Sequence, residues 1–222
     1  MRNCYNNRMI KAVIFDMDGL LTDNKPIWRT PHRKVLAKRG FTVSEDDVRE
    51  MAGKGTLHIV SLWRERFNGW DPTQAEAVCQ EIFEEVATLV ADEGKELPGV
   101  TPLVKALYDK QIPLAVASSS PLFLIEMTLR KLKIDTFIPI LHSGVDEAHP
   151  KPAPDVYLSA AKSLGVSPEF CLVFEDSPSG IASAKAAGMT CIAVPEPGRD
   201  LSLFAQADSI IASLAVFDIT TL

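Results

Sequence analysis

The residues best suited to chemistry are two aspartates, Asp16 and Asp18, that directly follow an unbroken apolar run at residues 12–15. Such a run is typical of a strand buried on both faces of a parallel sheet, and ligands bind where these strands end. If the strand direction continues through Met17, both carboxylates project to the same side. Two carboxylates this close repel unless a cation lies between them or one binds a proton. The pair predicts a metal site, proton transfer or both, with an ordinary turn or helix-cap role as the alternative.

Similar polar groups follow other apolar runs. Ser118 follows residues 114–117, and Glu175 and Asp176 follow residues 171–174. The carboxyl ends of parallel strands meet at one edge of a sheet, so we expect these side chains to converge there. Lys151 stands between two prolines, in a stiff loop that can aim its ammonium group. The alternatives are that Ser118 only caps a helix, that Lys151 is a solvated surface lysine, and that the two carboxylates are ordinary turn residues.

These four segments resemble, in order, the four motifs of the haloacid dehalogenase-like (HAD) hydrolases. They are DMDGLLTDN from Asp16, LAVASSS around Ser118, HPKPAPDVY around Lys151 and LVFEDSPSGI around Glu175 and Asp176. Within the family the chain is most similar to the branch of β-phosphoglucomutases and phosphosugar phosphatases, in particular the hexitol (2-deoxyglucose 6-phosphate) phosphatases. The resemblance implies an α/β fold with a Rossmann-like parallel sheet and a small inserted helical cap.

The residues suit phosphoryl transfer, in which charge neutralisation and positioning matter most. Asp16 is the expected nucleophile, forming an acyl phosphate, and Asp18 the expected general acid and base. A site of carboxylates would repel a phosphate unless it held a hard cation, and Mg²⁺ fits oxygen ligands. The resemblance assigns the same roles to both aspartates. It adds that Asp18 contacts Mg²⁺ through its backbone carbonyl.

The remaining assignments concern the metal and the phosphate. We expect Asp176 to bind Mg²⁺ directly and Glu175 to do so directly or through water. The hydroxyl of Ser118, with that of Ser119, can bind phosphate oxygens ahead of a helix opening at Pro121, whose dipole favours anions. The family match favours Lys151 as a further phosphate-binding residue.

Periodicity divides the chain into a helical segment and an α/β segment. Residues 25–94 contain helical patterns without a strand-like run, which predicts a helical cap inserted into a core of residues 1–24 and 95–222. We expect the cap helices to begin at Thr30, at Ser44 and, behind Asp71 and Pro72, at the longest one, which ends near residue 92.

From Pro98 onward, strands and helices alternate, which indicates a parallel sheet covered on both faces. We expect strands at residues 11–16, 114–117, 137–141, 171–174, 190–194 and 209–211. The helices are expected at residues 101–110, 121–132, 154–164, 179–187 and 201–205.

Specificity is expected to come from the cap. Gly53 and Lys54 lie in a turn where related mutases place substrate-contacting residues. The segment GKGT is not a nucleotide-binding loop, because the required G-x-x-x-x-G-K-S/T is absent. Where the mutases carry a histidine, this chain has Trp28, as the hexitol phosphatases do, and Lys25 replaces a common acidic residue. These features favour hydrolysis of small phosphorylated sugars or polyols, with a phosphosugar mutase as the alternative. The helical insert disfavours a phosphoacceptor signalling module, which needs no lid.

Composition limits the partners. The formal charge of −6, with Lys and Arg scattered, provides no basic face for nucleic acid. We expect neither a signal peptide nor a membrane span, because the first residues are polar and no apolar run is long enough to cross a membrane. Its four cysteines have no CxxC spacing, which indicates reduced thiols. We therefore expect a cytoplasmic monomer that acts on a small-molecule phosphate ester.

Overall fold

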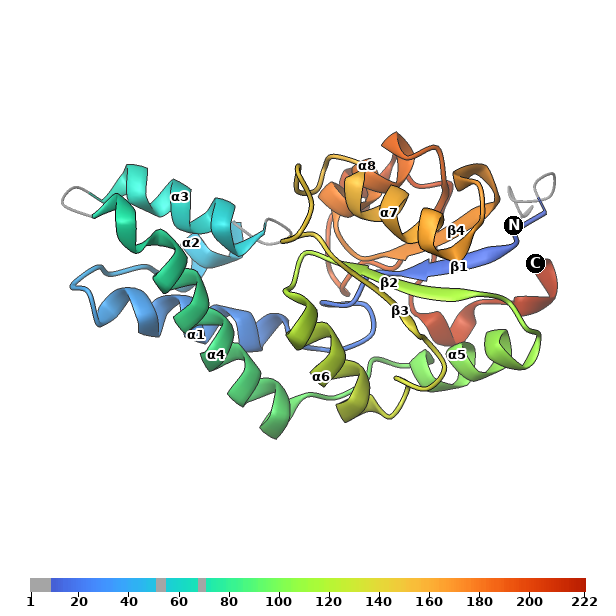
Figure 1. Cartoon of the computed structure of the whole chain (residues 1–222), viewed down its shortest axis with the longest axis horizontal. Coiled ribbons are helices and arrows are strands. Elements are labelled where there is room, and N and C mark those ends of the chain that lie inside the picture. Colours follow the sequence, from blue (N-terminus) through green and yellow to red (C-terminus); the bar gives the residue numbers. More distant parts are fainter. Residues whose placement is uncertain (1–8, 51–54, 68–70) are drawn as a thin grey trace.

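The structure is a computed structural model that describes residues 9–50, 55–67 and 71–222. Its centre is a six-stranded parallel sheet with the order β3-β2-β1-β4-β5-β6 (Figure 1). The strands are β1 (Ala12–Phe15), β2 (Leu114–Ser118), β3 (Ile140–Ser143), β4 (Cys171–Glu175), β5 (Thr190–Ala193) and β6 (Ser209–Ile210). The chain builds outward from β1 through β2 to β3, then returns to place β4 on the other side of β1. This reversal creates a crevice at the carboxyl end of β1, where ligands of open α/β sheets bind.

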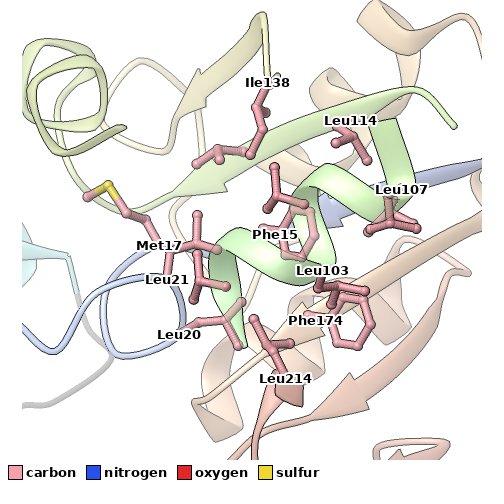
Figure 2. Close-up of a cluster of buried hydrophobic side chains, with 14 of the residues drawn as sticks. Phe15, Met17, Leu20, Leu21, Leu103, Leu107, Leu114, Ile138, Phe174 and Leu214 are labelled. Carbon is pink, nitrogen blue, oxygen red and sulfur yellow. The ribbon is translucent and has the colours of Figure 1, made fainter. Parts of the chain in front are cut away.

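Helices cover both faces of the sheet, because the central strands are apolar on both sides. One face packs against α5 (Val100–Asp109) and α6 (Leu122–Leu132), and the other against α7 (Asp155–Leu164) and α8 (Pro178–Ala186). Figure 2 shows the first of these cores, with the Phe15 and Phe174 rings packed near Leu103 and Leu107. The expected α/β parallel fold is confirmed.

Four further helices pack together beyond the carboxyl edge of the sheet (Figure 1). They are α1 (Lys25–Ala37), α2 (Glu45–Glu50), α3 (Thr56–Arg66) and α4 (Ala75–Glu93). They share an apolar cluster that is separate from the two cores at the sheet. The segments leading in and out lie side by side, since Asp23 N–H donates to the carbonyl of Lys95 at 3.1 Å and Leu97 N–H to that of Leu21 at 3.2 Å.

Several element boundaries differ from the sequence predictions. Helix α1 begins at Lys25, five residues before the predicted start at Thr30, and Pro31 lies inside it. Proline in a helix interior removes one hydrogen bond, but buried side chains on both sides of Pro31, including Ile27 and Val35, hold the helix against its neighbours.

Three other predicted elements also differ from the structure. Asp71 caps a short 3₁₀ turn, Pro72–Gln74, and the long helix α4 follows only at Ala75. Strand β3 begins at Ile140, whereas Phe137 lies in the preceding turn with its ring against Tyr108. The predicted helix at residues 201–205 is a 3₁₀ turn, Leu201–Phe204. Short 3₁₀ turns also occur at Pro168–Phe170, Leu214–Val216 and Ile219–Thr221.

Cys79, Cys171 and Cys191 are buried free thiols, and Cys4 lies outside the described residues. Within residues 9–50, 55–67 and 71–222, no helix has the length and apolar character needed to cross a membrane.

Candidate active site

The predicted residues converge where the central strands end. Asp16 follows β1, Ser118 ends β2, Glu175 ends β4 and is followed by Asp176, and Lys151 reaches in from the loop between β3 and α7. The strand register places Asp16 beside Glu175, because the residues immediately before them, Phe15 and Phe174, are partners in the pairing of β1 with β4. These strand ends face a cavity of about 500 Å³. Among the residues that line it are Asp16, Asp18, Trp28, His32, Thr56, Ser119, Ser120, Lys151, Glu175, Asp176 and Arg199.

Lys151 is the cation at the floor of this cavity, and it is buried. Its Nζ lies 2.7 Å from Oδ1 of Asp16, 2.9 Å from Oε1 of Glu175, 3.2 Å from the carbonyl oxygen of Ala117 and 3.0 Å from the hydroxyl of Tyr157. Burial alone would lower the pKa of Lys151, but the Asp16 and Glu175 carboxylates together raise it above its usual value. The ammonium therefore stays charged and holds the two carboxylates in fixed positions.

Three buried carboxylates, those of Asp16, Glu175 and Asp176, offer oxygen atoms that all lie within 4.8 Å of one another. Burial is the largest influence on Asp16 and raises its pKa well above the usual value; Lys151 opposes this rise, and the neighbouring acids add to it. Carboxylate oxygens grouped this closely are hard donors, and they fit a divalent cation such as Mg²⁺.

Glu175 is fixed by the start of α8. Its Oε2 accepts hydrogen bonds from the backbone N–H of Ser177 at 2.7 Å and from the Ser177 hydroxyl at 3.0 Å. The same hydroxyl caps the helix by accepting from Gly180 N–H at 3.0 Å. The carboxylate lies so close to α8 that a Cβ added at Gly180 would be 1.5 Å from Oε1 of Glu175. The hydroxyl of Tyr157 also donates a hydrogen bond to Oε1 of Glu175, at 3.1 Å.

Asp18 accepts hydrogen bonds from both the sheet and α1. Its Oδ1 accepts from the indole Nε1 of Trp28 at 3.0 Å and from Asn24 Nδ2. Its Oδ2 accepts from the hydroxyls of Ser118 at 3.0 Å and Ser120 at 2.6 Å. Ser118, expected to face phosphate, is fully buried and supports this carboxylate, while Ser119 and Ser120 line the cavity.

Asp16 and Asp18 were expected to project to the same side only if the strand direction continued through Met17, and the strand ends before that residue. Strand β1 ends at Phe15, and Gly19 adopts a left-handed φ of 88° that favours glycine. Within the described residues, the side chain of Asp18 lies outside the three-carboxylate cluster. This leaves only its backbone carbonyl to serve the metal role predicted for it.

Other residues were missed or cannot be placed. Gly53 and Lys54 lie outside the described residues, although the next two residues, Gly55 and Thr56, line the cavity. Asn24 and Tyr157 were not predicted, because nothing in their sequence context indicates a role. Ser120 could have been suspected from the run of three serines that ends β2.

Comparison with known proteins agrees with this geometry. A sequence model of the haloacid dehalogenase-like hydrolases matches residues 10–188. The chain belongs to this family. HAD hydrolases similar to it include hexitol phosphatase B of Escherichia coli K12, 34% identical over 93% of this chain and 94% of that protein. A phosphorylated carbohydrates phosphatase of Thermotoga maritima is 33% identical over 81% and 82% of the two chains.

Solved HAD structures share the fold over more than nine tenths of the chain. CbbY from Rhodobacter sphaeroides, in complex with phosphate, superposes with a TM-score of 0.87 at 27% identity, covering 96% of this chain and 99% of that one. A putative β-phosphoglucomutase from T. maritima superposes with a TM-score of 0.69 at 31% identity, covering 91% and 94%. The chain is therefore a hydrolase with the α/β fold of this family.

Proposed function

We propose that the chain is a Mg²⁺-dependent phosphatase that hydrolyses small phosphorylated sugars or polyols through an aspartyl phosphate on Asp16. The observation that carries this proposal is the position of the Asp16 carboxylate in the cavity, beside a buried ammonium and two further buried carboxylates. The names of the similar phosphatases support a phosphorylated carbohydrate as the substrate.

Asp16, Glu175 and Asp176 would hold Mg²⁺ with their carboxylates and Asp18 with its backbone carbonyl. The bound ion would supply positive charge that offsets the repulsion between these acids and a phosphate dianion. Lys151 contributes its own charge and, by binding Oδ1 of Asp16, fixes the orientation of the nucleophile.

In the first step, a carboxylate oxygen of Asp16 forms a bond to phosphorus while the bond between phosphorus and the sugar oxygen breaks. Asp18, in its protonated form, gives its proton to the departing sugar oxygen. In the second step, Asp18 takes a proton from water as the water oxygen attacks phosphorus. The bond from phosphorus to Asp16 then breaks, and inorganic phosphate leaves. Ser119 lines the cavity and would supply a hydroxyl donor for the phosphate oxygens, whereas the Ser120 hydroxyl donates to Asp18.

We further propose that residues 25–94 form a cap over a core of residues 1–24 and 95–222, and that the cap contributes substrate-binding residues, including Gly53 and Lys54. The separate apolar cluster of α1–α4 supports this division. A site enclosed by a cap excludes bulk water during phosphoryl transfer. The free buried thiols support the cytoplasm as the place of action.

Replacing the nucleophile tests the mechanism. We expect Asp16→Asn to lower phosphate release by a factor of about 10³ or more, because the amide is a poor nucleophile. The exposed neighbour Asp23 offers a matched control, Asp23→Asn, which should keep the activity. A panel of sugar, polyol and nucleotide phosphates should be assayed for both phosphate and isomerised product. Full activity of Asp16→Asn would exclude this nucleophile, and isomer without phosphate would indicate a mutase.

A further inference from the structure

The cavity contains a polar group that the proposed reaction does not use, the imidazole of His32. This residue lies on α1 and is only 2% exposed, yet it lines the cavity. Its ring packs edge-on against Trp63, with centroids 5.0 Å apart, and lies 6.2 Å from the ring of Trp28. Its Nδ1 is buried and, within the part of the chain that the structure describes, has no hydrogen-bond partner.

A buried nitrogen without a hydrogen-bond partner destabilises the folded state. An apolar side chain could pack against the same aromatic rings without this desolvation penalty. Core histidines normally bond to a carbonyl or hydroxyl group. Nδ1 itself is shielded from solvent, but the ring forms part of the cavity wall, so the imidazole is positioned to meet a bound ligand.

The chemistry of the ring indicates which ligand group it can bind. Burial lowers the pKa of His32 to about 4, so the imidazole is neutral near pH 7. A neutral imidazole donates a hydrogen bond from one nitrogen and accepts one at the other. This matches a hydroxyl group, which also donates and accepts, and gives no charge to attract a second phosphate.

The position of His32 on the helix indicates how far along the substrate it reaches. His32 follows Trp28 by four residues, so the two side chains share one face of α1 about 6 Å apart along the axis. The indole N–H of Trp28 donates a hydrogen bond to Asp18, the residue that would protonate the leaving oxygen. His32 therefore lies one helical turn beyond the reacting end of the substrate.

We propose that His32 is a specificity-determining residue that binds a hydroxyl group on the part of the substrate distant from the phosphate, and so favours polyol or sugar phosphates of five or six carbons over shorter esters. This inference rests on the proposed phosphatase function.

The test compares three esters in the wild type and in His32→Phe, which keeps an aromatic ring but removes both nitrogens. The esters are a hexitol 6-phosphate, glycerol 3-phosphate and p-nitrophenyl phosphate, whose leaving group carries no further hydroxyl. We expect His32→Phe to lower kcat/KM for the hexitol phosphate by about five- to tenfold, and to leave p-nitrophenyl phosphate within about twofold. His32→Gln, which restores a donor and an acceptor, should recover part of the loss.

Matched controls separate the possible failures. His58→Phe makes the same change at an exposed position of α3 and should leave all three activities unchanged. An equal loss on all three esters in His32→Phe, or no loss on any, would overturn the inference while leaving the phosphatase function intact. If His32→Phe does not fold, as judged by circular dichroism, the same substrate ratios in His32→Gln and His32→Leu decide the matter. A wild type that hydrolyses none of the esters would instead refute the proposed function.

Discussion

The carboxylate of Asp18 takes hydrogen bonds from two parts of the molecule that are distant in sequence. Ser118 and Ser120 belong to the end of β2, whereas Trp28 belongs to α1. Because the indole N–H is a donor without an acid–base function near neutral pH, Trp28 can orient the carboxylate but cannot replace it in proton transfer. We interpret Trp28 as a positioning residue for Asp18, the proposed general acid.

Replacing Trp28 tests this interpretation. Trp28→Phe keeps an aromatic ring against Phe83, which it meets edge-on, but removes the donor to Asp18. We expect kcat to fall about tenfold for sugar or polyol phosphates, whose leaving oxygen needs a proton. For p-nitrophenyl phosphate, whose leaving group needs none, kcat should change little. Steady-state kinetics on both ester types measure the difference.

Trp63 provides the matched control, because its indole N–H has no partner within the described residues. Trp63→Phe should leave the ratio of the two activities as in the wild type. The positioning role fails if Trp28→Phe lowers both activities by the same factor.

The buried imidazole of His32 also affects stability. Burial lowers its pKa to about 4 from an ordinary value of 6.5, so the unfolded chain binds a proton more readily than the folded one. The contribution of neutral His32 is fully present above pH 6.5 and is lost as the pH falls toward 4. The loss amounts to about 3 kcal/mol in the free energy of unfolding.

Urea unfolding at pH 7 and pH 4.5 measures this loss. The decrease in unfolding free energy should be smaller in His32→Phe than in the wild type, because phenylalanine does not titrate. His58→Phe, on the exposed side of α3, should show the wild-type decrease. Equal decreases in the wild type and in His32→Phe would show that His32 is not the group responsible.

At the scale of elements, the start of α8 fixes the acid at the end of β4. Gly180 leaves room for the Glu175 carboxylate, which in turn binds Lys151. Gly180→Ala would bring a methyl group to 1.5 Å from Oε1 of Glu175, so the carboxylate or the helix must move. A shift of about 1 Å at a catalytic site can lower activity about a hundredfold.

We expect this loss in kcat of Gly180→Ala, with the helical content retained by circular dichroism. Ala186→Ser, an exposed change on the same helix, is the control and should keep the activity. Wild-type turnover in Gly180→Ala would mean that the position of Glu175 does not limit the reaction.

Elements with a strong local signal were predictable, and those set by distant contacts were not. The run at residues 171–174 has only apolar side chains, so β4 was identified to within one residue. Proline usually marks a helix start, which misled the prediction at Pro31, because the packing of α1 against α4 overrides this preference. Phe137 has a strand-like character, but its ring contacts Tyr108 of α5 from a turn.

At the scale of the whole molecule, the sequence identified the residues that end the buried strands, since parallel strands bring their carboxyl ends to one edge. It did not identify Asn24, which reaches Asp18 from the position just before α1, or Tyr157, which reaches Glu175 from α7. These contacts depend on how α1 and α7 lie against the sheet. The spacing of residues along the sequence does not indicate how these helices pack against the sheet.

We expect the proposed Mg²⁺ site in the acidic cluster to make the stability of the whole molecule depend on the ion. Without a metal ion, the carboxylates of Asp16, Glu175 and Asp176 repel one another within 4.8 Å, and Lys151 pairs with the first two of them. Mg²⁺ that binds only the folded state adds about 2.7 kcal/mol at a hundred times its Kd. For a chain of this size, this corresponds to a rise in Tm of about 5–10 °C.

Thermal unfolding with EDTA and with excess Mg²⁺ therefore tests the site without an activity assay. Asp176→Asn removes one negative charge while keeping the shape of the side chain. We expect Mg²⁺ to raise the Tm of this variant by less than it raises the Tm of the wild type. Asp146→Asn, an exposed change, should show the wild-type rise. An equal rise in Asp176→Asn and in the wild type would place the bound ion away from this cluster, because the loss of a ligand must weaken binding at its own site.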